Sequence, residues 1–231
     1  MSMNINTLPK GAPKERLDLG VPQRGMRVAR LQSIVTLGTQ VGMVYKDEKK
    51  PDRQMVTLGF ELPRDLIQAE GTDFHGKPHI LREDMAVSGH EKSKLVQRYT
   101  ALDPLGKANG EFKELLGAAC TVQVAHKEGM KGTKSEGRTF ANINDVTEIM
   151  EGLDVPPLIN PPLYFDFYNP DKEALSRVPK FLRDKMLAAL DISPELTEMI
   201  KELEEEYKAK SEEKSADKEA GRPAASSNRQ W

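Results

Sequence analysis

Three groups of basic side chains stand out in the sequence, and two of them lie in short segments rich in turn-forming residues. The first group is Arg27 and Arg30, within a run of largely apolar residues. The second lies in the charged segment 45–53 and comprises Lys46, Lys49, Lys50 and Arg53. The third follows the apolar run TVQVAH and comprises Lys127, Lys131, Lys134 and Arg138. A phosphate backbone is bound by several cations at successive positions, so these groups predict contacts with a polyanion.

An aromatic side chain adjoins each of the two basic turns. Tyr45 begins the first turn, and Phe140 follows the second. A flat ring can stack on a nucleic-acid base, which contributes about 1 to 3 kcal/mol per base without reading the sequence. We therefore predict that Tyr45 and Phe140 are stacking residues, with Phe60 and Phe74 as further candidates. The alternative is that these rings are core residues and that the lysine-rich turns are only solvated.

The remaining reactive residue types do not form a catalytic or metal-binding pattern. The sequence contains no GxSxG, no Walker-type GxxxxGK[ST] and no GxGxxG after a strand. His75 and His79 are four residues apart, but Gly76 and Pro78 disfavour the helix that would place both on one face. The single cysteine, Cys120, lies in the apolar run AACTVQV, which favours a buried thiol. The sequence thus predicts a binding protein, not an enzyme, with no metal and no cofactor.

Apolar periodicity predicts the elements that would position the basic and aromatic residues. Alternation with a period of two indicates strands, and apolar residues three or four apart indicate helices. In chain order we predict strands over 26–39, 55–62 and 79–85, one or two short helices within 90–117, and strands over 121–126 and 138–149. This is the order of a five-stranded oligonucleotide/oligosaccharide-binding (OB) barrel with its helix between strands three and four, although other small α/β domains share it. The predicted fold class is mainly β with α.

The predicted barrel would bring the two basic turns to one groove. OB barrels receive oligonucleotides across strands two and three, between the first hairpin loop and the loop joining strands four and five. The segments 45–53 and 127–138 are those two loops, and Gly129 and Gly132 would let the second one approach a nucleic-acid strand closely. The predicted DNA-binding residues are therefore Arg27, Arg30, Tyr45, Lys46, Lys49, Lys50, Arg53, Lys127, Lys131, Lys134, Arg138 and Phe140.

Five segments of residues 25–150 resemble the OB-fold single-stranded DNA-binding proteins encoded by phages and prophages, a family with many uncharacterised members. These segments are GMRVARLQSIVTLGTQ, VTLGFELP, HEKSKL, ELLGAACTVQVAH and RTFANINDV. The resemblance implies non-catalytic binding and protection of single-stranded DNA during phage replication or recombination. The chain departs from the commonest pattern in its long KEGMKGTKSEG loop and its charged C-terminal helix. The alternative function is a phage structural or protein-interaction module on a similar barrel.

Residues 151–210 differ in composition from the preceding domain. The segment VPPLINPPLYFDFYNP contains five prolines and four aromatic residues, which predicts an extended strip that packs over the barrel or reaches another subunit. A helix interrupted at Pro179 is predicted over 171–190, and another begins at Ser193 with a continuous apolar stripe. We expect this stripe to dock, with a solvated helix as the alternative, so residues 156–207 are a candidate contact between copies of the chain.

The two ends of the chain are predicted to lack fixed structure. Residues 1–24 form a flexible leader and residues 211–231 a disordered tail, because both are polar and lack apolar periodicity. Beyond residue 190 the chain has 11 acidic and 7 basic residues, against 25 acidic and 27 basic before it. The tail resembles the acidic, aromatic-tipped tails with which phage and bacterial single-stranded DNA-binding proteins recruit replication proteins. Trp231 is therefore the predicted partner contact, and an end without function is the alternative.

The sequence also lacks membrane and export signals. No apolar run approaches the roughly 18 residues that a membrane span requires. The first residues, MSMNINTLPKGAPKER, have no apolar core of a signal peptide. We therefore expect a cytoplasmic protein, in the host cell if the chain is phage-encoded, with single-stranded DNA as its main partner.

Overall fold

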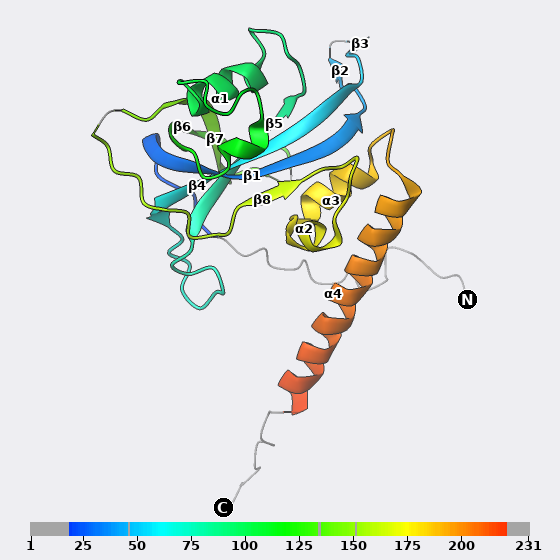
Figure 1. Ribbon diagram of the computed structural model, residues 1–231. Coiled ribbons are helices and arrows are strands. Elements are labelled where there is room, and N and C mark those ends of the chain that lie inside the picture. The colour runs from blue at the N-terminus through cyan, green and yellow to red at the C-terminus, as the bar shows by residue number, and fades with distance from the viewer. Residues whose placement is uncertain (1–18, 46, 134, 151, 221–231) are drawn as a thin grey trace, which may run out of the picture.

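The computed structural model describes residues 19–220 except positions 46, 134 and 151, and the side chains of Tyr45 and residues 210–220 lie outside the description. Its centre is one sheet of six strands with helices around it (Figure 1). The strands are β1 (Gly25–Gln40), β4 (Arg53–Leu66), β5 (Pro78–Ala86), β6 (Ala119–Glu128), β7 (Thr139–Glu148) and β8 (Leu163–Phe165), and a separate small hairpin is formed by β2 (Val44–Tyr45) and β3 (Glu48–Lys49). The helices are α1 (Lys94–Leu102), the 3-10 turn η2 (Phe112–Leu115), α2 (Lys172–Arg177), α3 (Lys180–Leu187) and α4 (Pro194–Ala220).

The five long strands follow the predicted chain order, but they do not close into a barrel. They lie side by side as β5-β4-β1-β6-β7, each antiparallel to its neighbours, and α1 lies between β5 and β6 in the sequence. Among the described residues no ladder joins β5 to β7, so these two strands are the edges of an open sheet. The prediction of a mainly β fold with helices is confirmed, whereas the closed five-stranded barrel is not.

A buried arginine bridges the two open edges. Arg98 of α1 is only 2% exposed and donates to Glu83 on β5 from Nε at 3.0 Å, and to Asp145 on β7 from Nη1 at 2.7 Å. Its Nη2 also contacts the carbonyl oxygen of Asn144 on β7 at 3.4 Å. Burial alone would lower the pKa of Arg98, but the hydrogen bonds and charges of Glu83 and Asp145 raise it. The side chains of Arg98 and its two partners therefore join β5 to β7 where ladder hydrogen bonds would close a barrel.

Alternating side chains of the strands build the first core on one face of the sheet. On β4 the buried apolar residues are Val56, Leu58, Phe60 and Leu62, two positions apart as the period of a strand requires. They pack with Ala29 and Leu31 of β1, and Leu31 stands directly opposite Phe60 in the β1–β4 ladder. Because a shift of one residue would turn all of these side chains to the other face, the hydrophobic pattern fixes the register.

The other face of β1 builds a second core with the C-terminal segment. Val35 and Leu37 pack against apolar residues of β8 and the helices α2, α3 and α4. β6 pairs with β1 only over residues 25–30, and β8 then pairs in parallel with residues 33–35. β1 thus takes part in both cores, and residues 25–150 and 151–210, predicted as separate regions, share one sheet.

Polar side chains fix the proline-rich segment that precedes β8. Arg30 donates to the carbonyl oxygens of Gly117, Val155 and Pro156 at 2.6 to 2.7 Å. Glu61, which is fully buried, accepts hydrogen bonds from the backbone N–H groups of Ile159 and Asn160. Buried backbone groups need partners, and prolines interrupt the regular ladder that would supply them. These two side chains therefore replace ladder hydrogen bonds in this segment.

The C-terminal segment bears on two sequence predictions. Its apolar stripe docks on its own chain, since Leu196, Ile200 and Leu203 are buried in the second core. Contact between copies through residues 156–207 stays a prediction, and Ile159 and Leu190 are exposed apolar side chains within that range. Helix α4 continues to Ala220, ten residues into the predicted tail. Residues 208–220 consist mostly of Lys, Glu and Ala, which are strong helix formers, and contain neither Gly nor Pro. Trp231 and the leader residues 1–18 lie outside the described residues.

The bridging arginine leads to a prediction about stability. Replacing Arg98 with Leu should lower the free energy of unfolding by about 3 to 5 kcal/mol, because Glu83 would remain as a buried charge without its main partner. The matched control is Lys94→Met, which removes a second cation from Glu83 but one whose side chain is 60% exposed, and should cost less than about 1 kcal/mol. Urea unfolding followed by circular dichroism measures both values. Equal losses from the two variants would contradict the bridging role.

Candidate nucleic-acid interface

The hairpin formed by β6 and β7 is the strongest candidate for contact with a polyanion. Its loop is closed by a hydrogen bond from Gly129 N to the carbonyl oxygen of Arg138 at 2.8 Å. A Cβ on Gly129 would lie 1.7 Å from the carbonyl oxygen of Ser135, so only glycine fits where the two sides of the loop approach each other. The two sides of the loop are thus held together at its base.

Three described cations of this hairpin are exposed and have no described ion pair. They are Lys127 at the end of β6, Lys131 in the loop, and Arg138 before β7. Among the described residues none of the three has a salt bridge or a side-chain hydrogen bond. Glu136, the acidic residue of the loop, accepts a hydrogen bond from Gly132 N at 2.7 Å. The fourth predicted cation, Lys134, lies outside the described residues.

An exposed ring accompanies these cations. Phe140 is 43% exposed and stands directly opposite Lys127 in the β6–β7 ladder, which places both side chains on one face of the hairpin. Phe140, Lys127 and the exposed Met130 line a hollow of about 310 Å³. The structure therefore brings together a ring and a cation that the sequence predicted separately, and the alternative of a core residue does not hold for Phe140.

The first hairpin differs from the β6–β7 hairpin in its charge balance. Lys49 is paired with Asp52 at 3.5 Å. Asp47 in the turn and Glu48 on β3 add two further acidic groups. A hydrogen bond from Gly42 N to Asp52, together with Lys49, lowers the pKa of that carboxyl group against the effect of burial. The predicted contacts Lys50 and Arg53 are exposed. Lys46 and the side chain of Tyr45 lie outside the described residues.

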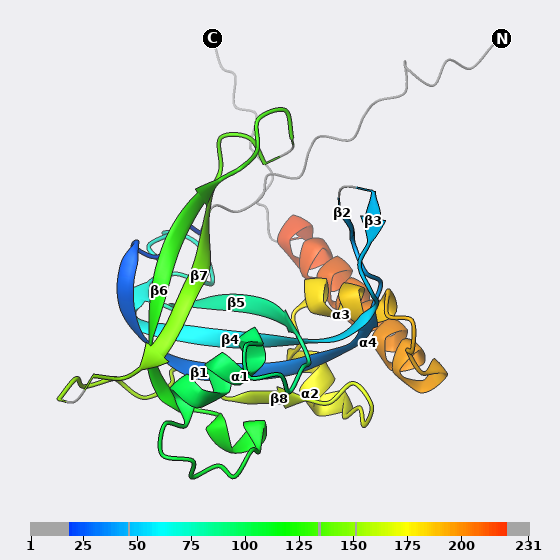
Figure 2. The ribbon, with the colours of Figure 1, turned by 90° about the horizontal axis from the view of Figure 1, so that it is seen from above.

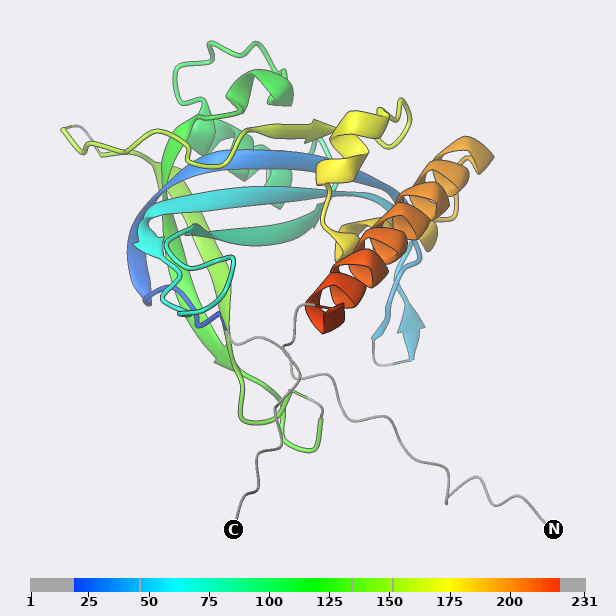
Figure 3. The same ribbon diagram turned by 90° about the horizontal axis from the view of Figure 1, so that it is seen from below.

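The two hairpins project to the same side of the molecule. Figures 2 and 3 show the β2–β3 hairpin and the loop between β6 and β7 extending in the same direction, on the side of the sheet where β5 forms its edge. α1 and the loop after it lie on the opposite side (Figure 2). The two basic turns therefore project to one side of the sheet, and a single DNA groove between them stays a prediction.

The two predicted arginines of β1 serve the fold. Arg30 donates from Nε and Nη2 to the proline-rich segment and from Nη1 to the carbonyl oxygen of Gly117. Arg27 donates to the side chain of Gln23 at 2.6 Å and lies 3.9 Å from Asp65. Because their hydrogen-bonding groups already have protein partners, we leave Arg27 and Arg30 out of the interface.

One cluster near the first hairpin was missed by the sequence reasoning. Phe181 of α3 is 48% exposed and lies between two cations, with Arg82 Cζ of β5 and Lys185 Nζ each 5.8 Å from the ring centroid. Lys185 is also ion-paired with Asp84 on β5. The cluster depends on the docking of α3 beside β5, which no local pattern predicts. The one sequence feature that could have indicated this cluster is an aromatic residue, Phe181, in the first turn of the helix that follows Pro179.

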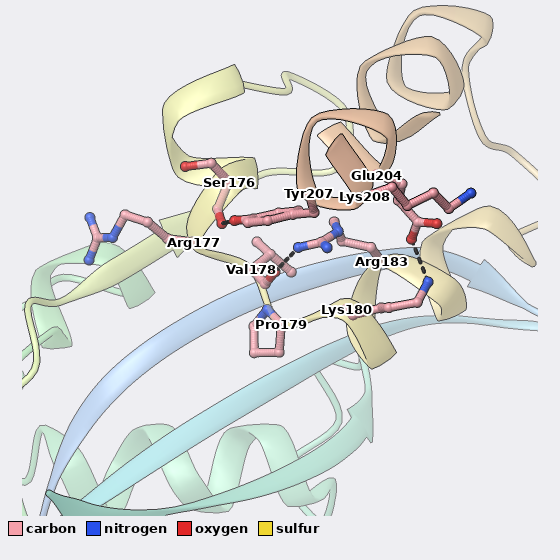
Figure 4. Close-up of a pocket in the computed structure, with 9 residues that line it drawn as sticks. All are labelled: Ser176, Arg177, Val178, Pro179, Lys180, Arg183, Glu204, Tyr207 and Lys208. Atoms are coloured by element: carbon pink, nitrogen blue, oxygen red, sulfur yellow. Dashed lines mark hydrogen bonds and ion pairs between the residues drawn. The ribbon is translucent and has the colours of Figure 1, made fainter. Parts of the chain in front are cut away.

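A second hollow, of about 480 Å³, lies where α4 meets α2 and α3 (Figure 4). Several cations line it, but its polar groups connect the helices to one another. Tyr207 donates to the carbonyl oxygen of Ser176 at 2.9 Å, and its ring lies 5.4 Å from the guanidinium carbon of Arg183. Lys180 pairs with Glu204 of α4 at 2.5 Å. This hollow is a docking contact of α4, and we do not assign it a ligand.

The described part of the chain has neither a metal-binding cluster nor a membrane-spanning helix. Within it, no group of three or more His, Cys, Asp or Glu side chains is arranged to hold a metal ion. None of the described helices is long and apolar enough to cross a bilayer. His75 and His79, the pair considered from the sequence, lie in the loop before β5 and on β5 itself. Burial lowers the pKa of His79, against the raising effect of Asp65.

The single cysteine provides a test of the first core. Cys120 is fully buried on β6, and burial raises the pKa of its thiol to about 12. Because only the thiolate reacts, the folded protein should resist alkylation by iodoacetamide at pH 8 and react promptly in 6 M guanidinium chloride, as mass spectrometry would show. Rapid alkylation of the folded protein at pH 8 would mean that β6 is not packed as described.

The comparisons with known proteins do not assign this chain to a family. No family model, no curated protein and no solved structure matches it.

Proposed function

We propose that this protein binds single-stranded DNA without catalysis, chiefly through the β6–β7 hairpin. The observation that carries the proposal is the set of three cations without described ion pairs, Lys127, Lys131 and Arg138, beside the exposed ring of Phe140. The cations suit successive phosphates, and the ring suits an unstacked base. The resemblance of residues 25–150 to phage single-stranded DNA-binding proteins favours a role in protecting DNA during replication or recombination.

The strand order supports the same proposal. The order β5-β4-β1-β6-β7, with α1 between β5 and β6 in the chain, corresponds to strands three, two, one, four and five of an OB fold. We propose that the sheet is an opened OB fold in which Arg98 takes the place of the last ladder. The groove would then run across β4 and β5, between the β2–β3 and β6–β7 hairpins.

A single strand fits this surface better than a duplex. In a duplex the bases are stacked on one another, and their faces are not accessible to a side chain such as Phe140. The β6–β7 hairpin places its ring and its cations on adjacent positions, which matches a strand that alternates bases with phosphates. We therefore expect binding with little sequence preference, since stacking on a ring is tolerant of base identity.

A salt-resolved titration with a fluorescent oligonucleotide tests the proposal. The wild-type protein should bind at low salt, with the logarithm of affinity falling by about 0.7 per neutralised phosphate per logarithmic unit of salt. Replacing Lys127, Lys131 and Arg138 with Ala should weaken binding and reduce the slope by up to about 2, because up to three phosphate contacts are lost. Fluorescence anisotropy at four or more salt concentrations gives both quantities.

The matched control removes three exposed lysines from the α1 side of the molecule. Lys92, Lys107 and Lys113 are exposed and lie just before α1, in the loop after it and in η2. Helix α1 and the loop after it lie on the side away from both hairpins (Figure 2). Their replacement with Ala changes the net charge by the same amount, so it should leave the slope nearly unchanged. Absence of oligonucleotide binding by the wild-type protein at low salt would instead favour the interaction-module alternative.

A further inference from the structure

The Phe181 cluster on α3 has the composition of a base-stacking site. Its ring is 48% exposed, and the cationic groups of Arg82 and Lys185 both lie 5.8 Å from its centroid. Flat exposed rings combined with cations are the elements with which proteins bind single strands. The ring comes from α3 and Arg82 from β5, so the cluster exists only because the C-terminal segment docks on the sheet.

Apart from the contact with the ring of Phe181, Arg82 has no polar partner among the described residues. Among the described residues its guanidinium has no hydrogen bond and no ion pair, and its Nε is buried without a hydrogen-bond partner. This distinguishes Arg82 from Arg30 and Arg98, whose guanidinium groups are bound by carbonyl or carboxylate oxygens. A buried donor without a partner is unfavourable, and an anionic oxygen beside the guanidinium would reduce that cost.

The other charges of the cluster leave room for an anion. Asp84, which alternation along the strand places on the same face of β5 as Arg82, is ion-paired with Lys185 and accepts a hydrogen bond from the hydroxyl of Thr57 at 2.7 Å. Its negative charge is therefore balanced by Lys185. Arg82 remains as the net positive charge beside the ring of Phe181.

The position of the cluster connects it with the β6–β7 hairpin. α3 lies beside β5 and near the β2–β3 hairpin, on the side toward which both hairpins project (Figures 2 and 3). A strand that leaves the β6–β7 hairpin and crosses β5 would reach α3 before it reaches the β2–β3 hairpin. The two exposed rings, Phe140 and Phe181, would then contact different nucleotides of the same strand.

We propose that Phe181, flanked by Arg82 and Lys185, is a second base-stacking position that extends the single-stranded DNA site from the β6–β7 hairpin across β5. This inference rests on the proposed function. It makes the C-terminal helices part of the binding surface, and it predicts that long oligonucleotides use a contact that short ones do not reach.

The test compares oligothymidylates of about 5 and about 15 nucleotides, within the range of site sizes known for OB folds. Phe181→Leu keeps an apolar side chain on α3 but removes the ring, and should weaken binding of the longer oligonucleotide roughly 5- to 150-fold. Binding of the shorter one should change little. Because no charge is lost, the salt slope should stay as in the wild type, whereas Arg82→Met should lower it by about 0.7.

The matched control is Phe74→Leu, at a ring that the sequence offered as a further stacking candidate but that the structure places outside the proposed path of the strand. Phe74 is 44% exposed and has Lys77 Nζ 5.7 Å from its ring centroid, but it lies in the loop between β4 and β5, at the end of the sheet away from the β2–β3 hairpin (Figure 1). This variant should bind both oligonucleotides like the wild type. Thermal unfolding of each variant shows whether a loss of affinity reflects a loss of fold.

The outcomes separate this inference from the proposed function. If the wild type binds and the hairpin variant is weakened, but Phe181→Leu binds the longer oligonucleotide as tightly as the wild type, the second stacking position is overturned alone. If the wild type binds neither oligonucleotide, both proposals fail. Should Phe181→Leu unfold, photocrosslinking of the wild type to a 15-mer containing 5-iodouracil decides: an adduct on the α3 peptide supports the inference, and adducts confined to other peptides overturn it.

Discussion

The salt bridges of Arg98 to Glu83 and Asp145 are the interaction on which the arrangement of the sheet depends. They join the edge strands β5 and β7 through a side chain that is only 2% exposed. The position of β7 fixes the hairpin it forms with β6, and the position of β5 fixes Arg82 and the contact with α3. One buried arginine therefore links the strand that carries Phe140 directly to the strand that carries Arg82, although that arginine is remote from the proposed ligand.

A second constraint is that β1 serves two cores at once. Ala29 and Leu31 face the core beneath α1, while Val35 and Leu37 face the C-terminal helices. The proline-rich segment between β7 and β8 can join the two cores because Arg30 and Glu61 bind its backbone carbonyl and N–H groups. These contacts make the C-terminal segment a continuation of the sheet, which is why a residue of α3 can take part in a surface built on β5.

The strands and helices were predictable from the sequence because each has a local pattern, such as the alternation of Val56, Leu58 and Phe60 or the break at Pro179. The open edges of the sheet could not be predicted in this way, because no local pattern shows that β5 and β7 are joined by a polar residue of α1 whose partners are 15 and 47 positions away. Among the candidate site residues, the pairing of Lys127 with Phe140 could have been predicted from the sequence, because it follows from the hairpin of two adjacent strands. The structural role of Arg30 could not be predicted, because a basic residue on a strand looks the same in the sequence whether it binds a phosphate or a distant carbonyl oxygen. Phe181 was missed because its cluster forms only when α3 docks beside β5, which no local pattern predicts.

The central claim is that a single strand of DNA lies along the β6–β7 hairpin and continues across β5 to α3. Backbone amide chemical shifts of the isotope-labelled protein, followed during titration with a 15-mer oligothymidylate, test it most directly. The claim predicts that the largest changes occur over residues 127–140 and around Arg82 and Phe181, while the loop after α1 is unaffected. Changes confined to the loop after α1, or no changes at all at low salt, would contradict it.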